Sequence, residues 1–273
     1  MGIKVQWLLM CCCHFLIDSN ANSPLHEKGI TIIIPSYNNA SWYQYNLESV
    51  LQQEYENYRA IYLDDASEDN TGALVKEYLA KNDSAHRVQF IQNKQRSGAL
   101  ANIYAAVWMC APSEIIITLD GDDWLAHDCV LKKINEVYSN SDVWMTYGQY
   151  ISYPDDGGYG AQALPQWVIE NASYRSYDWV TTHLRTFYAG LFQNIKKEDL
   201  LYEDKFFSVA WDLGFMFPLL EMSAAHCRYI PEVLYVYNTA NPLNDNKHHK
   251  ELQLMLEKFI RKKQKYSPVE KLL

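Results

Sequence analysis

Residues 114–123 read EIIITLDGDD, a run of apolar, mostly β-branched side chains that ends at three aspartates within four residues. Such a run is typical of a strand that is buried on both faces of a parallel sheet. Residues 29–34 (GITIII) and 59–63 (RAIYL) repeat the pattern and end at a proline and at an aspartate pair. Strands with polar residues directly after them indicate an α/β fold with its chemistry at the strand ends.

Helical patterns separate these strands. The expected helices lie at residues 41–53, from the cap-like residues 67–71 to about residue 79, at 97–109 and at 126–138, with a short strand at 88–91. This alternation predicts an open, mostly parallel, Rossmann-like sheet with helices on both faces. From about residue 150 the pattern loosens. There we expect an irregular aromatic segment at 167–185, a helical segment at 205–225 that Pro218 kinks or breaks, and a strand at 228–237.

The carboxyl ends of parallel strands meet at one edge of a sheet, so the side chains that follow these strands should converge on one crevice. They are Tyr37, Asp64, Asp65, Asp120, Asp122 and Asp123. Carboxylates held together raise one another's pKa unless a cation neutralises them. Aspartates around a glycine offer hard oxygen ligands, which suit Mg²⁺ or Mn²⁺ bridging to phosphate. Helix capping accounts for an isolated aspartate, but it is a poor explanation for three aspartates within four residues.

Composition excludes several classes of protein. The chain has 273 residues, 48% hydrophobic and 21% charged, which is typical of one large or two small globular domains. A net charge of −9 argues against nucleic acid as a partner. The sequence contains neither GxGxxG nor GxxxxGK[ST], which disfavours a dehydrogenase and a P-loop NTPase. The six cysteines have no CxxC spacing, so we expect no zinc site.

The two ends of the chain suggest contact with a membrane. Residues 5–17 are almost entirely apolar, which predicts a signal peptide or a membrane anchor at 1–23. A cleaved signal would place the protein in a secretory lumen, and an uncleaved one on the cytoplasmic face of a membrane. Residues 247–273 carry eight Lys or Arg and three Glu, and 248–265 predict a basic amphipathic helix. This helix packs on the domain in one reading and on an anionic membrane surface in the other.

Four motifs in order resemble the family 2 inverting glycosyltransferases of the GT-A fold. They are IIIPSYN at 32–38, LDDASEDNT at 63–71, SGALAN at 97–102 and TLDGDD at 118–123. The resemblance covers roughly residues 29–240.

The resemblance implies a catalytic domain at 24–246, with a nucleotide-binding half at about 29–148 and an acceptor half at about 149–246. It implies transfer of a sugar from a nucleotide-sugar, a UDP-sugar being the commonest donor in the family. The acceptor would be a hydroxyl of a glycan, a lipid or a protein. The reaction would be a single displacement with inversion that depends on Mn²⁺ or Mg²⁺.

The resemblance also assigns roles to individual residues. Nucleotide binding falls to Pro35, Tyr37, Asp64, Asp65, Gly98 and Asp120, metal binding to Asp122 and Asp123, and the role of catalytic base to Asp212. The base of the family usually follows a glutamate, whereas here it follows Trp211. Asp204 and Glu221 are therefore the alternative bases.

Other residues are weaker candidates, each with a structural role as the competing interpretation. They are Lys94 and Arg96 for phosphate, His183 and Arg185 for the acceptor, Trp167, Trp179 and Trp211 for sugar stacking, and His248 and His249, in the polar loop 241–249, as extra metal ligands. Three other functions remain open. They are a haloacid-dehalogenase-like phosphatase, because IIITLDGD at 115–122 imitates its motif, a nucleotidyltransferase, and an inactive protein that only binds a sugar nucleotide.

Overall fold

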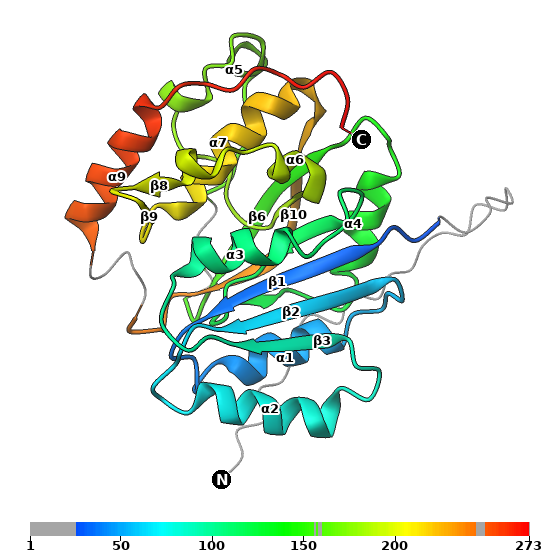
Figure 1. Cartoon of the computed structure of the whole chain (residues 1–273). Coiled ribbons are helices and arrows are strands. Elements are labelled where there is room, and N and C mark those ends of the chain that lie inside the picture. The colour runs from blue at the N-terminus through cyan, green and yellow to red at the C-terminus, as the bar shows by residue number, and fades with distance from the viewer. Residues whose placement is uncertain (1–25, 156, 158–159, 244–248, 273) are drawn as a thin grey trace, which may run out of the picture.

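The computed structural model describes residues 26–155, 157, 160–243 and 249–272 (Figure 1). The predicted leader and His248 therefore lie outside the described residues. One eight-stranded sheet runs through the molecule in the order β3-β2-β1-β4-β7-β6-β10-β5. Its strands are β1 (Ile30–Ser36), β2 (Tyr58–Asp64), β3 (Val88–Gln92), β4 (Ile115–Thr118), β5 (Trp124–Leu125), β6 (Met145–Tyr153), β7 (Arg185–Tyr188) and β10 (Cys227–Asn238).

The strand directions confirm an open, mostly parallel sheet. β1 pairs in parallel with β2 and β4, β2 with β3, and β6 with β10. β7 is antiparallel to both β4 and β6, and β5 is antiparallel to β10. β7 thus joins the predicted parallel half to a second half, in which the sequence pattern predicted only the strand at 228–237, observed as β10.

Helices cover both faces of the sheet (Figure 1). They are α1 (Tyr43–Leu51), α2 (Thr71–Asn82), α3 (Ala99–Val107), α4 (Val130–Tyr138), α5 (Gln166–Glu170), α6 (Ala189–Gln193), α7 (Trp211–Ser223) and α9 (Lys250–Lys262). A small hairpin, β8 (Leu201–Tyr202) and β9 (Lys205–Phe206), lies outside the main sheet, and single 3₁₀ turns occupy Tyr174–Ser176, Lys197–Leu200 and Ala224–His226.

The apolar run of β1 separates the two cores. Ile30, Ile32 and Ile34 pack in one buried cluster with residues of α1, α2 and α4. Ile33 packs in the other cluster with residues of α3, α6, α7 and α9. Successive strand residues point to opposite faces, so a strand that is apolar at every position needs cover on both sides.

Three predicted elements differ from the structure. The helix expected at 126–138 begins only at Val130, because Trp124 and Leu125 pair with β10. The segment at 167–185 holds the short helix α5 and one 3₁₀ turn, and it leads into β7. α7 continues through Pro218, although proline costs an interior helix about 3 kcal/mol. Every residue of α7 from 213 to 223 is buried, so the helix is stabilised by tertiary packing.

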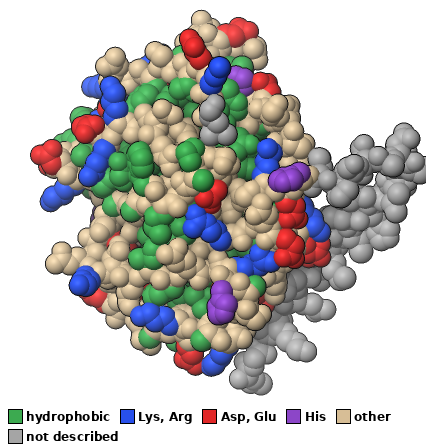
Figure 2. Space-filling model, turned by 45° about the vertical axis from the view of Figure 1, so that its right-hand side comes forward, with side chains coloured by type: hydrophobic (Ala, Val, Ile, Leu, Met, Phe, Trp, Pro, Cys, Tyr) green, Lys and Arg blue, Asp and Glu red, His purple; other side chains and the backbone are tan. Residues whose placement is uncertain are grey.

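The basic helix α9 packs on the domain. Leu256 and Ile260 are buried in the core that contains α7, and the Arg261 guanidinium donates to the carbonyls of Arg175 and Tyr177. No helix in the described part of the chain is long and apolar enough to cross a membrane. Figure 2 shows acidic and basic side chains interspersed over one face, where they form no continuous basic patch. These contacts favour the packed-helix interpretation, and the membrane interpretation stays a prediction.

A buried ion pair fastens the C-terminal segment to α7. Arg175 Nε donates to Glu221 Oε1 at 2.6 Å and Arg175 Nη2 to Glu221 Oε2 at 2.9 Å. The same residues bond to the chain near α9, because Arg175 Nη1 donates to the Ile260 carbonyl and Glu221 Oε2 accepts from the Tyr266 amide. Glu221 is therefore committed to structure and is excluded as the catalytic base.

Replacing Glu221 with alanine should lower the free energy of unfolding by about 3–5 kcal/mol, because it leaves the Arg175 charge buried without a partner. Equilibrium denaturation in urea measures the loss. Glu77→Ala is the matched control: its side chain is 65% exposed in an ion pair with Lys81, and removing it should cost about 0.5 kcal/mol or less. Equal losses in the two variants would contradict the proposed role of the buried pair.

Candidate active site

A cleft of about 1400 Å³ opens at the carboxyl ends of β1, β2 and β4 and extends to α7 and α9. It brings together eight of the nine predicted site residues: Pro35, Tyr37, Asp65, Gly98, Asp120, Asp122, Asp123 and Asp212. Pro35 lies near the end of β1, the next six follow strands or open α3 at the same edge of the sheet, and Asp212 lies in the first turn of α7.

Asp64 does not line the cleft, so the structure corrects its predicted role. Asp64 is the last residue of β2 and is fully buried. Its Oδ2 accepts a hydrogen bond from the Gln92 amide at 2.9 Å and would lie 2.6 Å from a Cβ on Gly72 of α2. Side chains alternate along an extended chain, so Asp64 faces α2 while Asp65 faces the cleft.

Asp65 holds the loop that leads into α3. Its Oδ1 accepts from the Asn93 side chain and the Ser97 amide, and its Oδ2 from the Gly98 amide at 2.8 Å. Burial alone would raise the pKa of Asp65, but these hydrogen bonds lower it below its usual value. Gly98 has a φ of 90°, a conformation that glycine adopts without a steric cost.

The turn with the three aspartates is clamped from two sides. On one side, the buried amide of Asn46 in α1 donates to the carbonyls of Asp120 and Asp123, at 3.0 and 2.8 Å. On the other, Asn238 at the end of β10 donates its backbone amide to Asp123 Oδ1 at 2.7 Å. Gly121 is required for close packing, because a Cβ there would lie 2.6 Å from Ser36 Cβ.

Asp122 and Asp123 have different surroundings. Asp123 is buried and also accepts a bond from the Tyr235 hydroxyl through Oδ2. Burial, Asp122 and Asp120 raise the pKa of Asp123 well above its usual value. Asp122 is partly exposed in the cleft, where its Oδ2 accepts from the Asn241 side-chain amide at 2.7 Å.

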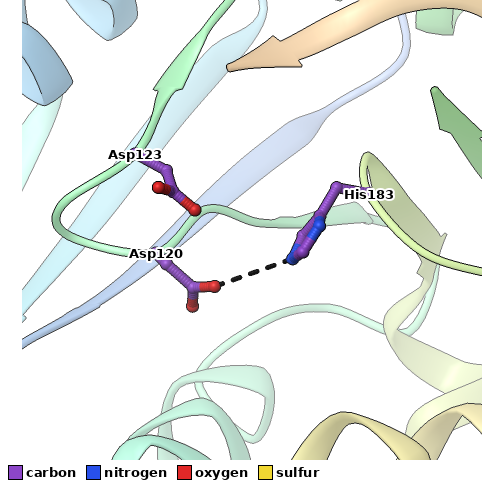
Figure 3. A group of neighbouring side chains, drawn as sticks. All are labelled: Asp120, Asp123 and His183. Carbon is purple, nitrogen blue, oxygen red and sulfur yellow. Dashed lines mark ion pairs between the residues drawn. The ribbon is translucent and has the colours of Figure 1, made fainter. Parts of the chain in front are cut away.

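His183 approaches the acidic turn from the segment before β7 (Figure 3). Its Nε2 lies 3.8 Å from Asp120 Oδ2, its Nδ1 bonds to the Thr182 hydroxyl, and its ring stacks on Tyr235. Burial and then the Arg185 charge lower the pKa of His183 well below its usual value, so the imidazole is neutral near pH 7.

Asp120, Asp123 and His183 form a candidate metal site, because each offers a ligand atom within 4.8 Å of the others. Two carboxylates and a neutral imidazole are suitable ligands for Mn²⁺. Burial is the main cause of the raised pKa of Asp123, and repulsion by Asp122 and Asp120, which a cation would relieve, adds to it. The donor set therefore fits a divalent ion. Compared with the sequence-based assignment, this site keeps Asp123 and adds Asp120 and His183, and Asp122 lies beside it in the cleft.

Asp212 is held by a buried arginine. Arg185 Nη2 donates to Asp212 Oδ2 at 2.7 Å, and the Arg185 side chain is only 4% exposed. The other carboxylate oxygen is not used in this bond. Of the alternative bases, Asp204 lines the cleft on the β8–β9 turn, whereas Glu221 is bound to Arg175.

The weaker candidates divide between the cleft and the rest of the surface. Arg96 lines the cleft and its guanidinium lies 3.9 Å from the centre of the Tyr37 ring, and Trp211 and His249 also line the cleft. Lys94 is outside the residues that line the cleft. Trp167 is 54% exposed and packs its ring edge on Tyr177.

Sequence reasoning missed the side chains that hold the site. They are Asn46, Tyr235, Asn238 and Asn241. Their only sequence signal is a polar residue on an otherwise apolar helix face or at a strand end, and many unrelated residues share that signal.

Fold and site together define a Rossmann-like GT-A domain with an acidic strand-end site. The profile of glycosyl transferase family 2 matches residues 31–199, more than half of the chain, and the protein belongs to that family.

Its similarity to curated proteins is limited in extent. It is 31% identical over 143 residues to the Escherichia coli UDP-Glc:alpha-D-GlcNAc-diphosphoundecaprenol beta-1,3-glucosyltransferase WfgD, covering 52% of this chain and 53% of that protein. It is 33% identical over 129 residues to an uncharacterized glycosyltransferase of Haemophilus influenzae, covering 47% and 48%. The chain spans about half or less of the length of these curated relatives.

Solved structures share the fold. Staphylococcus aureus TarS 1–349 in complex with UDP-GlcNAc superimposes with a TM-score of 0.64 at 14% identity, over 85% of this chain and 65% of that one. The mannosyltransferase PcManGT from Pyrobaculum calidifontis in complex with GDP-Man and Mn²⁺ gives a TM-score of 0.59 at 16% identity, over 91% and 68%.

Gly121→Ala should lower the free energy of unfolding by about 1–3 kcal/mol, because the new methyl group forces the acidic turn away from Ser36. It should also weaken nucleoside diphosphate binding, which titration calorimetry measures. Gly29→Ala is the control, since its Cβ would meet Glu114 Cγ at an ordinary 3.8 Å. If both variants behaved alike, close packing would not explain this glycine.

Proposed function

We propose that the protein transfers a sugar from a nucleotide-sugar, with UDP-sugars as the first candidates, to an acceptor hydroxyl with inversion at the anomeric carbon. The observation that carries this proposal is the placement of Asp212. Its carboxylate, held by Arg185, lines the same cleft as the three aspartates at the strand ends. The UDP-GlcNAc and GDP-Man complexes of proteins with the same fold support a nucleotide-sugar as the donor.

The proposed reaction is one displacement. Asp212 accepts the proton of the acceptor hydroxyl, and the oxygen of that hydroxyl forms a bond to the anomeric carbon. The bond from this carbon to the diphosphate oxygen breaks, and the nucleoside diphosphate leaves with the electron pair. Arg185 fixes the position of the base through the 2.7 Å hydrogen bond to Asp212 Oδ2.

A divalent cation fits the charge of this site. Asp120, Asp123 and His183 are the residues that would hold it, and Asp122, which the family resemblance assigns to the metal, lies beside them. When bound, it would neutralise the leaving diphosphate. The Asn46 and Asn238 hydrogen bonds keep the acidic turn in place, so the site does not have to be rebuilt when the donor binds.

The same residues support an active enzyme over a protein that only binds a sugar nucleotide. A binding protein needs the strand-end residues, but it has no use for a carboxylate oriented by a buried arginine in the opposite part of the cleft. Secretory or membrane-associated localisation stays a prediction.

Thermal unfolding with and without Mn²⁺, in the presence of UDP, GDP, CDP or ADP, tests the donor site. One diphosphate should raise the melting temperature in a Mn²⁺-dependent manner, with about 2.7 kcal/mol of stabilisation at a hundredfold excess over its Kd. Asp122→Asn should abolish the Mn²⁺-dependent part, whereas Asp142→Asn, whose side chain pairs with Arg228 away from the cleft, should retain it. A shift with none of the four diphosphates would contradict the proposed donor site.

Asp212→Asn should lower kcat for sugar transfer by about 10²–10⁴-fold while nucleotide binding stays near normal, because the amide cannot accept the proton. Transfer is measured by release of the nucleoside diphosphate together with the glycosylated product. Asp204→Asn serves as the comparison, and we expect a small effect. Full transfer by Asp212→Asn, or a larger loss in Asp204→Asn, would overturn the assignment of the base.

A further inference from the structure

A second pocket of about 230 Å³ adjoins the large cleft. His183, Arg185 and Asp212 line both cavities, so the proposed base lies where they meet. The cleft extends from Asp212 toward the acidic turn. The smaller pocket, named the acceptor pocket below, extends from Asp212 toward Tyr150, Trp179 and α9.

The walls of the acceptor pocket combine aromatic rings with neutral and acidic polar groups. Tyr150, Trp179 and Tyr237 supply the rings, and Thr182, Gln253 and Glu257 supply hydrogen-bonding groups. Aromatic faces pack against the C–H face of a pyranose, while amide and carboxylate groups bind its hydroxyls. Sites for drug-sized ligands start at about 300 Å³, so this pocket suits one sugar ring.

The charges in the acceptor pocket disfavour an anionic ligand. Arg185 is the cationic side chain among its described lining residues, and it is paired with Asp212. Glu257 is paired with Arg261, so the described lining offers a phosphate no unpaired Lys or Arg, and a lipid phosphate is a poor occupant.

The C-terminal helix provides one wall of the pocket. Gln253 and Glu257 are four residues apart, so they lie on one face of α9. Glu257 accepts a bond from Arg261 Nε at 2.9 Å, and Arg261 is fastened to the carbonyls of Arg175 and Tyr177. α9 lies beyond residue 199, where the match to the family profile ends.

We propose that the acceptor pocket binds one neutral monosaccharide unit whose hydroxyl is presented to Asp212, and that α9 determines which sugar is accepted. The proposal rests on the proposed function and names its acceptor class as carbohydrate. Trp179 provides the stacking surface, and Gln253 and Glu257 bind hydroxyls of the ring.

Binding is tested directly by saturation-transfer NMR on the full chain with UDP and Mn²⁺. The probes are the methyl glycosides of glucose, galactose, mannose and N-acetylglucosamine, with dodecyl phosphate and a serine-containing peptide for comparison. At least one glycoside should bind, and Trp179→Ala and Glu257→Gln should each weaken it about tenfold. Trp108→Ala and Glu251→Gln are the matched controls, because both side chains are exposed and outside the pocket.

Glycoside binding that is weakened by the two pocket variants and retained by the two controls would support the proposal. Binding of no glycoside, equal binding by all variants, or binding of only dodecyl phosphate or the peptide would overturn it. A melting curve of each variant without ligand identifies any that fails to fold, and Trp179→Leu and Gln253→Ala then replace it. The NMR readout needs no transfer, so failure of the donor site in the nucleotide test remains distinguishable from failure of the acceptor pocket.

Discussion

Two hydrogen bonds from the buried Asn46 amide hold the turn on which the whole site depends. They join α1 to the carbonyls on either side of the acidic turn, and Asn238 holds that turn from the end of β10. Three neighbouring carboxylates repel one another, so without this clamp the turn would open toward solvent. The close packing of Gly121 against Ser36 also restricts the position of this turn.

The two halves of the sheet carry different parts of the site. The parallel strands β1, β2 and β4 present the acidic turn and the loop before α3, which suits a nucleotide. The antiparallel strand β7 begins with Arg185, whose partner Asp212 opens α7. β7 pairs with β4, and this pairing places Arg185, the partner of Asp212, at the edge where the aspartates lie. α9, fastened through Arg175 and Glu221, closes the far side.

Sequence patterns located the parallel half well, because continuous β-branched runs and the aspartates behind them are local signals. The structure confirms the strands that carry Pro35, Asp65 and Asp120, and it brings Asp212 into the same cleft. Asp64 was predicted to line the cleft because it stands at the carboxyl end of a parallel strand, but alternation along the strand turns it toward α2. β6 and β7 were missed because their mixed aromatic and polar residues show no clear period.

The sequence by itself determined the fold class and the acidic residues of the site, since both depend on patterns within a few neighbouring residues. Tertiary structure alone decided how these residues are held and completed. His183 meets Asp120, Arg185 meets Asp212, and α9 meets Trp179 at the acceptor pocket. Each of these contacts joins segments more than twenty residues apart, and their formation depends on how the sheet and the helices pack.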